Sequence, residues 1–198
     1  MKYIKWIIFA IIDLLFNIIA YITNPFVLLF ADEVGNLPKI FLWWENWDDH
    51  LDVEWMISEH HVPKWAEYDF NRHYKYYSEW EADKIIGEHR GFVELLDPNF
   101  TLKERFQRYI CRLVWLYRNC AYGFSYYVTG VDVHKSDIIK IRNNKDDIFY
   151  ITKYAWVIKY EKPSFNNHHW EIFLGWKMQN VTNETNRCML AFRINPWQ

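Results

Sequence analysis

Several chemical signatures are scarce or missing in these 198 residues. Glycine and proline number six each, too few for a long flexible linker or a low-complexity tract. The three cysteines, Cys111, Cys120 and Cys188, are odd in number and include no CxxC pair, so they favour a reducing compartment over a disulfide framework. The sequence also lacks the GxSxG, P-loop, GxGxxG and HExxH motifs. We therefore expect no cofactor and none of the enzyme classes that these motifs mark.

An excess of one charge is missing as well. Lys and Arg number 23 and Asp and Glu number 25, so the net charge is −2 at pH 7. A dedicated nucleic-acid binder normally carries a basic excess, so this balance argues against nucleic acid as a partner. Aromatic residues, by contrast, make up 20% of the chain and include 12 Trp. Large rings bury much apolar area and also favour the membrane–water boundary, so the composition suits both a compact core and membrane contact.

The longest hydrophobic run lies at the N-terminus. From Trp6 to Ala31 the sequence reads WIIFAIIDLLFNIIAYITNPFVLLFA. A helix from about residue 4 to residue 23 would be roughly 30 Å long, which matches the hydrocarbon core of a bilayer. Pro25 disfavours continuation of that helix, and Asn24 followed by Pro25 is a good start for a second, short helix. The pattern predicts a membrane-length apolar helix, a break and a short apolar helix.

Other interpretations of this run stay open. A signal peptide fits the basic start at Lys2 and Lys5, but the apolar region is too long and no small-x-small cleavage site follows. A core helix of a soluble protein fits the polar stripe between Asp13 and Asn24. On a membrane helix the same stripe makes Asp13 and Asn17 candidate binding residues for another helix. A shallow re-entrant or interfacial helix pair is the last option, because the proline break lets the chain turn back.

We divide the chain into a membrane-associated apolar segment, residues 1–35, and a water-soluble, aromatic-rich domain, residues 36–198. The positive-inside rule places the N-terminal lysines in the cytoplasm and the domain on the other side of a spanning helix. The unpaired cysteines favour a cytoplasmic domain instead. A re-entrant pair removes the conflict, and we expect the domain to face the cytoplasm. The implied partners are the lipid bilayer and, through the N-terminal helix, further copies of the chain.

The domain has helical and β-rich stretches in succession. Thr101 and Glu104 have the spacing of a capping box, and apolar residues recur at helical spacing as far as Tyr117, which predicts an amphipathic helix beginning at Thr101. A shorter helix is expected over residues 79–86, ended by Gly87.

The last part of the domain is β-rich. Residues 147–161, 170–178 and 187–194 have the composition of strands, and polar turn-forming stretches separate them. Because the connections are short, we expect an antiparallel meander. The fold class is therefore α+β, with the amphipathic helix that begins at Thr101 packed on one face of the meander.

The densest acidic cluster runs from Asp48 to Glu54. Hard cations take several oxygen ligands, so Asp49, His50 and Asp52 are candidate metal ligands. The stretch lacks the ligand alternation and the central glycine of an EF-hand loop. The alternative interpretation is a solvated turn with helix-capping acids.

A basic stripe is the best candidate binding surface in the domain. Arg105, Arg108 and Arg112 lie on one side of the helix that begins at Thr101. Close to a membrane, each cation could contribute about 1 kcal/mol of attraction to anionic headgroups. Alternatively, these arginines pair with the acids of residues 45–54 inside the fold.

Three blocks of the sequence are distinctive. They are NPFVLLFADEVGNLPKIFLWWENWDDHLD, LKERFQRYICRLVWLYRNCAYGFSYYVTG and the closing IFLGWKM with RCMLAFRINPW, of which Trp115 to Phe124 is the most specific part. Together they resemble a family of uncharacterised tailed-bacteriophage proteins that pair a short apolar N-terminus with a small soluble domain. The resemblance covers most of the chain and implies a phage origin, with no assigned activity and no catalytic residue to carry over. Trp47, His50 and Glu54 depart from the family's pattern, which weakens a shared site in the acidic cluster.

These observations favour a non-enzymatic phage protein on the host inner membrane that acts by binding a host or phage partner. One alternative is an enzyme of unrecognised type that uses the acids from Asp48 to Glu54 together with a histidine. The other is a structural component of the virion.

Overall fold

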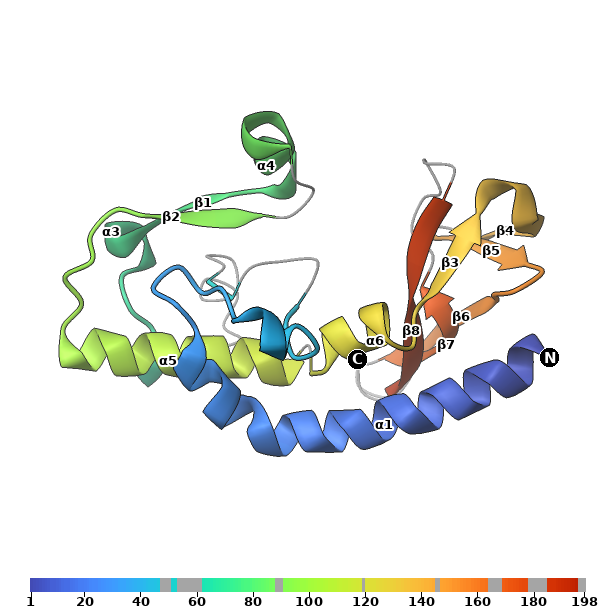
Figure 1. Cartoon of the computed structure of the whole chain (residues 1–198), viewed down its shortest axis with the longest axis horizontal. Coiled ribbons are helices and arrows are strands. Elements are labelled where there is room, and N and C mark those ends of the chain that lie inside the picture. The colour runs from blue at the N-terminus through green and yellow to red at the C-terminus, as the bar shows by residue number, and fades with distance from the viewer. Residues whose placement is uncertain are drawn as a thin grey trace. The chain divides into compact units, whose positions relative to one another are not determined.

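The computed structural model describes residues 1–46, 51–52, 62–87, 91–118, 120–144, 147–163, 169–177 and 185–195. Contacts divide the chain into two compact units (Figure 1). Unit 1 combines Met1–Phe16 with Phe124–Gln198, and unit 2 is Asn17–Gly123. The division expected after residue 35 rested on solvent preference and stays a prediction about membrane association, because contacts divide the chain elsewhere. The α+β class is confirmed.

The first helix, α1 (Lys2–Val27), runs through Pro25 and is followed by the short 3-10 helix η1 (Leu28–Phe30). The break expected at Asn24 and Pro25 therefore lies three residues later than predicted. A proline this close to the helix end removes one hydrogen bond, and local contacts offset that loss. The hydroxyl of Tyr109 donates to the Pro25 carbonyl at 2.8 Å, and Val27 and Leu28 are buried.

Unit 2 is mostly helical. After η1 it contains η2 (Lys39–Phe41), η3 (Lys64–Ala66), α3 (Phe70–His73), β1 (Tyr74–Tyr77), α4 (Glu79–Ile86), β2 (Phe92–Leu95) and α5 (Leu102–Arg118). The predicted helix over residues 79–86 is confirmed: Ser78 and Glu81 form a capping box, and Gly87 ends the helix with φ of 72°. The start of α5 is confirmed as well. Glu104 Oε2 accepts hydrogen bonds from the backbone N–H and the hydroxyl of Thr101, at 2.8 and 2.7 Å.

The core of unit 2 forms around one face of α5. Cys111, Trp115 and Leu116 on that helix are buried and pack in one cluster with the buried side chains of Leu28, Tyr74 and others. The periodicity predicted this face only in part. Leu116 is buried and Tyr109, Ile110 and Leu113 pack against the cluster, but Leu102 and Phe106 of the predicted face are 87% and 56% exposed. The cluster also takes in the end of α1 and both strands of the antiparallel pair β1–β2.

A tight turn follows α5 and leads into α6 (Tyr122–Tyr127). Ala121 is buried and adopts φ of 57°, a left-handed conformation that is uncommon outside glycine. A Cβ at Gly123 would collide with the carbonyl oxygen of Leu42 and would lie 2.8 Å from that of Glu45. The distinctive block from Trp115 to Phe124 thus holds a turn whose small residues allow close backbone approach.

Unit 1 contains a four-stranded sheet, called the sheet of unit 1 below, and the separate strand pair β4–β5. Its elements are β3 (Val131–His134), η4 (Lys135–Asp137), β4 (Ile138–Asn144), β5 (Asp147–Thr152), β6 (Val157–Pro163), β7 (His169–Lys177) and β8 (Thr185–Asn195). The predicted meander is confirmed as β6-β7-β8, and β3 adds to its far edge in the antiparallel order β3-β8-β7-β6. The stretch expected as one strand over residues 147–161 is two strands. The Thr152 hydroxyl accepts from the N–H groups of Tyr154 and Ala155, at 3.1 and 2.7 Å, and turns the chain there.

The helix that packs on the sheet of unit 1 is the first half of α1. Trp6, Phe9 and Ala10 contact a buried cluster that includes Trp176 and Leu190. We expected the helix that begins at Thr101 to cover the meander, and this detail is corrected. An amphipathic pattern shows that a helix has a buried face, but it does not say which of several apolar surfaces that face meets.

Candidate membrane interface

Asp13 anchors the first half of α1 to unit 1. Its Oδ1 accepts hydrogen bonds from the Ser125 hydroxyl at 2.7 Å and from the Thr129 hydroxyl at 3.2 Å. All three side chains are buried. A buried carboxylate is costly unless hydrogen bonds satisfy it, so these hydroxyls explain how an acid can lie within an apolar helix. The candidate binding residue Asp13 therefore binds its own chain.

Two further contacts hold the same face of α1 to strands of unit 1, one to β5 and one to β7. The ammonium of Lys2 donates to the Thr152 carbonyl at 2.9 Å, and the indole N–H of Trp6 donates to the Gly175 carbonyl at 3.0 Å. The ring of Trp6 also meets the ring of Trp156 edge to face, with centroids 5.2 Å apart. The protein-facing side of α1 is thus polar as well as aromatic.

The second half of α1 is attached to unit 2 in the same manner. The Trp44 indole donates to the Thr23 hydroxyl at 2.8 Å, and Tyr21 stacks on Tyr117 at 5.3 Å. Cys120 contacts the backbone carbonyl of Asn17, with 3.6 Å between sulfur and oxygen.

The candidate residue Asn17 is half-buried on this same stripe. Asn24 is 1% exposed, and its amide nitrogen lies 3.7 Å from the sulfur of Cys120. The polar stripe predicted from the sequence therefore meets the chain's own residues in both units.

The opposite side of α1 and η1 is apolar and exposed. Its side chains, each between 41% and 68% exposed, are Tyr3, Ile4, Ile7, Ile8, Ile11, Ile12, Leu14, Leu15, Ile18, Ile19, Ile22, Phe26, Leu29 and Phe30. On an ideal helix these positions occupy about half of the circumference, over a length of roughly 40 Å. Such a strip measures about 700 Å², whereas the largest apolar patch on a soluble monomer is roughly 300–600 Å². We call this surface the apolar face of α1.

Among the residues that the structure describes, Lys2–Phe30 is the one helical segment long and apolar enough to cross a membrane. Only 17% of its most apolar window is buried. A core helix of a soluble protein would be mostly buried. These exposures therefore favour a helix whose outer half meets an apolar environment such as lipid. The polar stripe alone fits a core helix, but the exposed half does not.

The basic stripe of α5 is largely engaged inside unit 2. Arg112 is 4% exposed, its Nε donates to Asp52 Oδ1 at 2.9 Å, and its Nη2 donates to the other carboxylate oxygen. Its Nη1 donates to the Asp32 carbonyl at 2.9 Å. Burial lowers the pKa of Arg112, but the charge of Asp52, its hydrogen bonds and the nearby Tyr74 and Tyr68 together outweigh that effect, so the net shift is upward. Arg112 thus shows the internal pairing that the sequence left as an alternative.

The other two arginines of the stripe differ in exposure. Arg108 donates to the Tyr74 hydroxyl at 2.7 Å, and that hydroxyl donates to the Glu33 carbonyl at 2.6 Å. Burial raises the pKa of Tyr74 to about 12, so the hydroxyl stays protonated and can fill both roles. Arg105 is exposed. Of the predicted stripe, Arg105 is the residue most open to an anionic ligand.

The predicted metal ligands are only partly placed. Asp49 and His50 lie outside the described residues, as does most of the stretch from Asp48 to Glu54. Asp52 is 3% exposed, and both of its carboxylate oxygens accept from Arg112. Within the described ranges no group of three or more His, Cys, Asp or Glu side chains could hold a metal ion.

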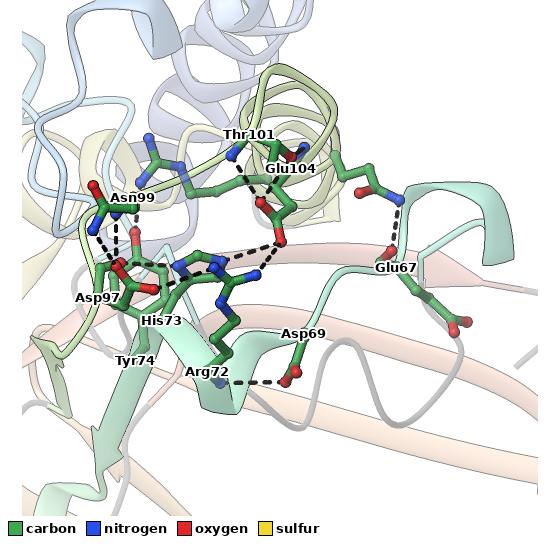
Figure 2. A network of polar contacts seen from close by, with 11 residues as sticks. Glu67, Asp69, Arg72, His73, Tyr74, Asp97, Asn99, Thr101 and Glu104 are labelled. Atoms are coloured by element: carbon green, nitrogen blue, oxygen red, sulfur yellow. Dashed lines mark hydrogen bonds and ion pairs between the residues drawn. The ribbon is translucent and has the colours of Figure 1, made fainter.

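A second polar network, drawn in Figure 2, surrounds His73. The ring is 0% exposed, its Nδ1 lies 2.8 Å from the Asp97 carbonyl, and its Nε2 lies 3.3 Å from Glu104. Arg72 reaches the carboxylates of both acids, at 3.4 and 3.5 Å. The backbone N–H of Thr101, its hydroxyl and His73 lower the pKa of Glu104 to about 2. A histidine without solvent access cannot exchange a proton with a substrate. The network therefore has a structural role, which is to join α3 to the start of α5.

The sequence did not identify two groups that belong to the interface. Ser125 and Thr129 hold Asp13, yet they lie more than a hundred residues away and carry no motif. Exposed apolar side chains on the sheet of unit 1, such as Ile158 and Ile194, were also missed. A sheet with one face in water has apolar and polar residues in alternation along each strand. In these strands apolar residues occur on both faces, and that pattern could have pointed to the exposed apolar side chains.

Comparisons with known proteins give one match. No curated protein and no solved structure matches this chain. A family model matches residues 1–198, which is the whole sequence, and its description assigns no function. The chain therefore belongs to DUF7338, a family of unknown function.

Proposed function

We propose that this chain is a non-enzymatic protein that lies on a membrane surface and holds its two units there to bind a partner. The observation that carries the proposal is the arrangement of α1. Its polar stripe contacts the chain's own residues along both halves of the helix, and its apolar face is exposed from Tyr3 to Phe30. A helix of this kind buries its apolar half in the headgroup–acyl boundary and keeps its polar half out of the lipid.

This arrangement favours an in-plane helix over a spanning one. The middle of a spanning helix lies at the bilayer centre, and Asp13 is near the middle of α1. Asp13 is held by Ser125 and Thr129, so spanning would draw the sheet of unit 1 into the hydrocarbon core. Open sheet edges are not tolerated there, because their backbone groups would lack hydrogen-bond partners. If α1 lies in the plane of one leaflet, the sheet of unit 1 does not have to enter the hydrocarbon core.

An in-plane helix also simplifies the orientation. Both ends of α1 then stay on one side of the bilayer, so the N-terminal lysines and the cysteines can share the cytoplasm. Cys111, Cys120 and Cys188 are all free thiols, which suits a reducing compartment. The resemblance to bacteriophage proteins makes the host inner membrane our proposed location.

Binding is favoured over catalysis by the use of the polar clusters. The buried pair of Arg112 with Asp52, and the buried ring of His73 with the partly buried Glu104, connect segments of unit 2. Of the candidate enzyme site between Asp48 and Glu54, Asp52 has its carboxylate occupied by an arginine. The proposed action is therefore recognition of a partner at the membrane.

Depth measurements test the in-plane helix. We would place a single dye-labelled cysteine at Ile4, Leu15 or Phe26 in a Cys120→Ser background and measure quenching by nitroxide lipids of graded depth. The in-plane helix predicts the same shallow depth, roughly 5–10 Å, at all three positions. A spanning helix predicts that Leu15 is deepest and that the other two lie near opposite surfaces. A label at Ser136, which is exposed in unit 1, is the control and should stay unquenched.

Crosslinking in expressing host cells tests the partner. The full-length protein is compared with Ile11→Lys, which puts a charge on the apolar face of α1 and should release the protein from membranes. The proposal predicts a crosslinked protein that depends on membrane attachment. An identical set of crosslinks for both proteins, or a wild-type chain that never sediments with membranes, contradicts it.

A further inference from the structure

The sheet of unit 1 carries a second exposed apolar surface. Strand pairing places Ile158 on β6 opposite Leu174 on β7, and Leu174 opposite Phe192 on β8. Directly opposed residues of antiparallel strands lie on the same face, so these three form one row across the sheet. Ile158 is 52% exposed and Phe192 is 50% exposed.

A second row lies beside the first. Tyr160 is opposite Ile172, which is opposite Ile194. Each of these residues is two positions away from a member of the first row on the same strand, so both rows lie on the same face. Tyr160 is 50% exposed and Ile194 is 55% exposed, and Trp170, two residues before Ile172, is 42% exposed. We call the exposed members of both rows, together with Trp170, the open end of the sheet.

The same sheet face is buried at its other end. Trp176 and Leu190 oppose each other there, at 0% and 3% exposed, in the cluster that takes in Trp6 of α1. The residues stay apolar from this end as far as the row of Tyr160, Ile172 and Ile194, although the cover ends partway. A sheet face that met water beyond that point would turn polar, so the pattern indicates a second apolar phase over the open end.

The open end continues the apolar surface of α1. The ring of Trp6 lies 6.0 Å from the ring of Phe192, at the boundary between the covered and exposed parts of the face. On α1 the exposed apolar side chains begin close by, at Tyr3 and Ile4. One occupant that meets α1 from Tyr3 onwards can therefore extend across Phe192 to the open end.

We infer that the open end of the sheet is a second membrane-contact surface, which enters the same lipid leaflet as the first half of α1. This inference rests on the proposed function. Tyr160 and Trp170 suit the headgroup boundary, because each ring is apolar with one polar group. β6 is the end strand in the sheet order, so its outer backbone groups need water and limit the depth of insertion. The surface therefore adds shallow anchoring.

Vesicle binding by the full-length protein tests this inference. The double variant Ile158→Ser with Ile194→Ser removes two half-exposed apolar side chains, and we expect binding to phosphatidylethanolamine and phosphatidylglycerol vesicles to weaken at least tenfold. The matched control is Ile139→Ser, because Ile139 is 69% exposed in unit 1 but lies on β4, outside this sheet. The control should bind like the wild type.

The outcomes separate the two proposals. If the wild type binds and the double variant binds equally well, the sheet inference is overturned and the role of α1 stands. If the wild type does not bind vesicles, the proposed function fails and the sheet inference falls with it. If the double variant instead turns a dimer into a monomer with unchanged vesicle binding, the open end is an interface between copies, which also overturns the inference.

A second readout does not depend on the folding of the double variant. A dye on Ile194→Cys, in the Cys120→Ser background, should shift its emission to the blue and be quenched by nitroxide lipids when vesicles are added. A dye on Ile139→Cys should not respond. Equal responses at both positions would contradict the inference.

Discussion

Replacing Asp52 with alanine should destabilise the protein more than replacing an exposed acid does. Arg112 is 4% exposed, and Asp52→Ala leaves its charge in the protein interior without the carboxylate that accepts two of its hydrogen bonds. Removal of one partner from a buried ion pair costs about 3–5 kcal/mol. Two bonds from Arg112 to the carbonyls of Asp32 and Glu33 remain, so we expect a loss near 3 kcal/mol.

Two comparisons isolate the buried charge. Asp132 also pairs with an arginine, Arg187, at 2.8 Å, but its side chain is 61% exposed, so Asp132→Ala should cost only about 0–1 kcal/mol. The double variant Asp52→Leu with Arg112→Met removes both charges. It should be more stable than Asp52→Ala, because no unpaired charge stays buried.

The measurement is urea unfolding of the full-length protein in a mild non-ionic detergent. Amide hydrogen exchange in α5 reports on unit 2 separately from unit 1. If Asp52→Ala lowers the free energy of unfolding no more than Asp132→Ala, or if the double variant is the less stable of the two Asp52 variants, the reasoning about a buried ion pair is wrong.

Two further predictions concern titratable groups. Thr101 and His73 lower the pKa of Glu104 from 4.5 to about 2, so its carboxylate stabilises the fold above about pH 4.5 and that contribution is lost as the pH falls towards 2. Glu104→Gln should therefore be less stable than the wild type at pH 7, and the difference should shrink on acidification; a difference that does not change with pH contradicts this. Burial raises the pKa of Cys111 and of Cys188 to about 12, whereas Cys120 is half-buried. A thiol reagent at pH 8 should modify Cys120 first and the other two only after unfolding, and mass spectrometry of digested protein would show any other order.

Local signals were sufficient for several elements. The Thr101–Glu104 and Ser78–Glu81 pairs begin helices because a hydroxyl and a carboxylate three residues apart satisfy free backbone groups at a helix start. Gly87 ends a helix because it adopts positive φ at little cost. Strand-forming composition between polar turn-forming stretches likewise located the strands of the meander, because β-branched and aromatic residues pack well on a sheet surface.

Long-range pairings were not available from the sequence. Nothing local indicates that Asp13 meets Ser125 and Thr129, because their contact depends on a turn near Gly123 and on the path of the chain between them. The use of Asp52 as the partner of Arg112, rather than as a metal ligand, also required two segments sixty residues apart to meet. The arginine stripe shows the same limit, because periodicity groups Arg105 with Arg112 although one is exposed and the other is buried.

The sequence by itself determined that the chain starts with a membrane-length apolar segment and continues as an α+β protein, because both properties follow from composition and local spacing. Only the tertiary structure decided what the polar stripe of that segment contacts. Its polar stripe could have met another helix, water or the chain's own residues, and hydrogen-bond partners from distant segments select the last of these. The other half of α1 is left exposed as a result, so the apolar surface can lie along a membrane without the helix crossing it.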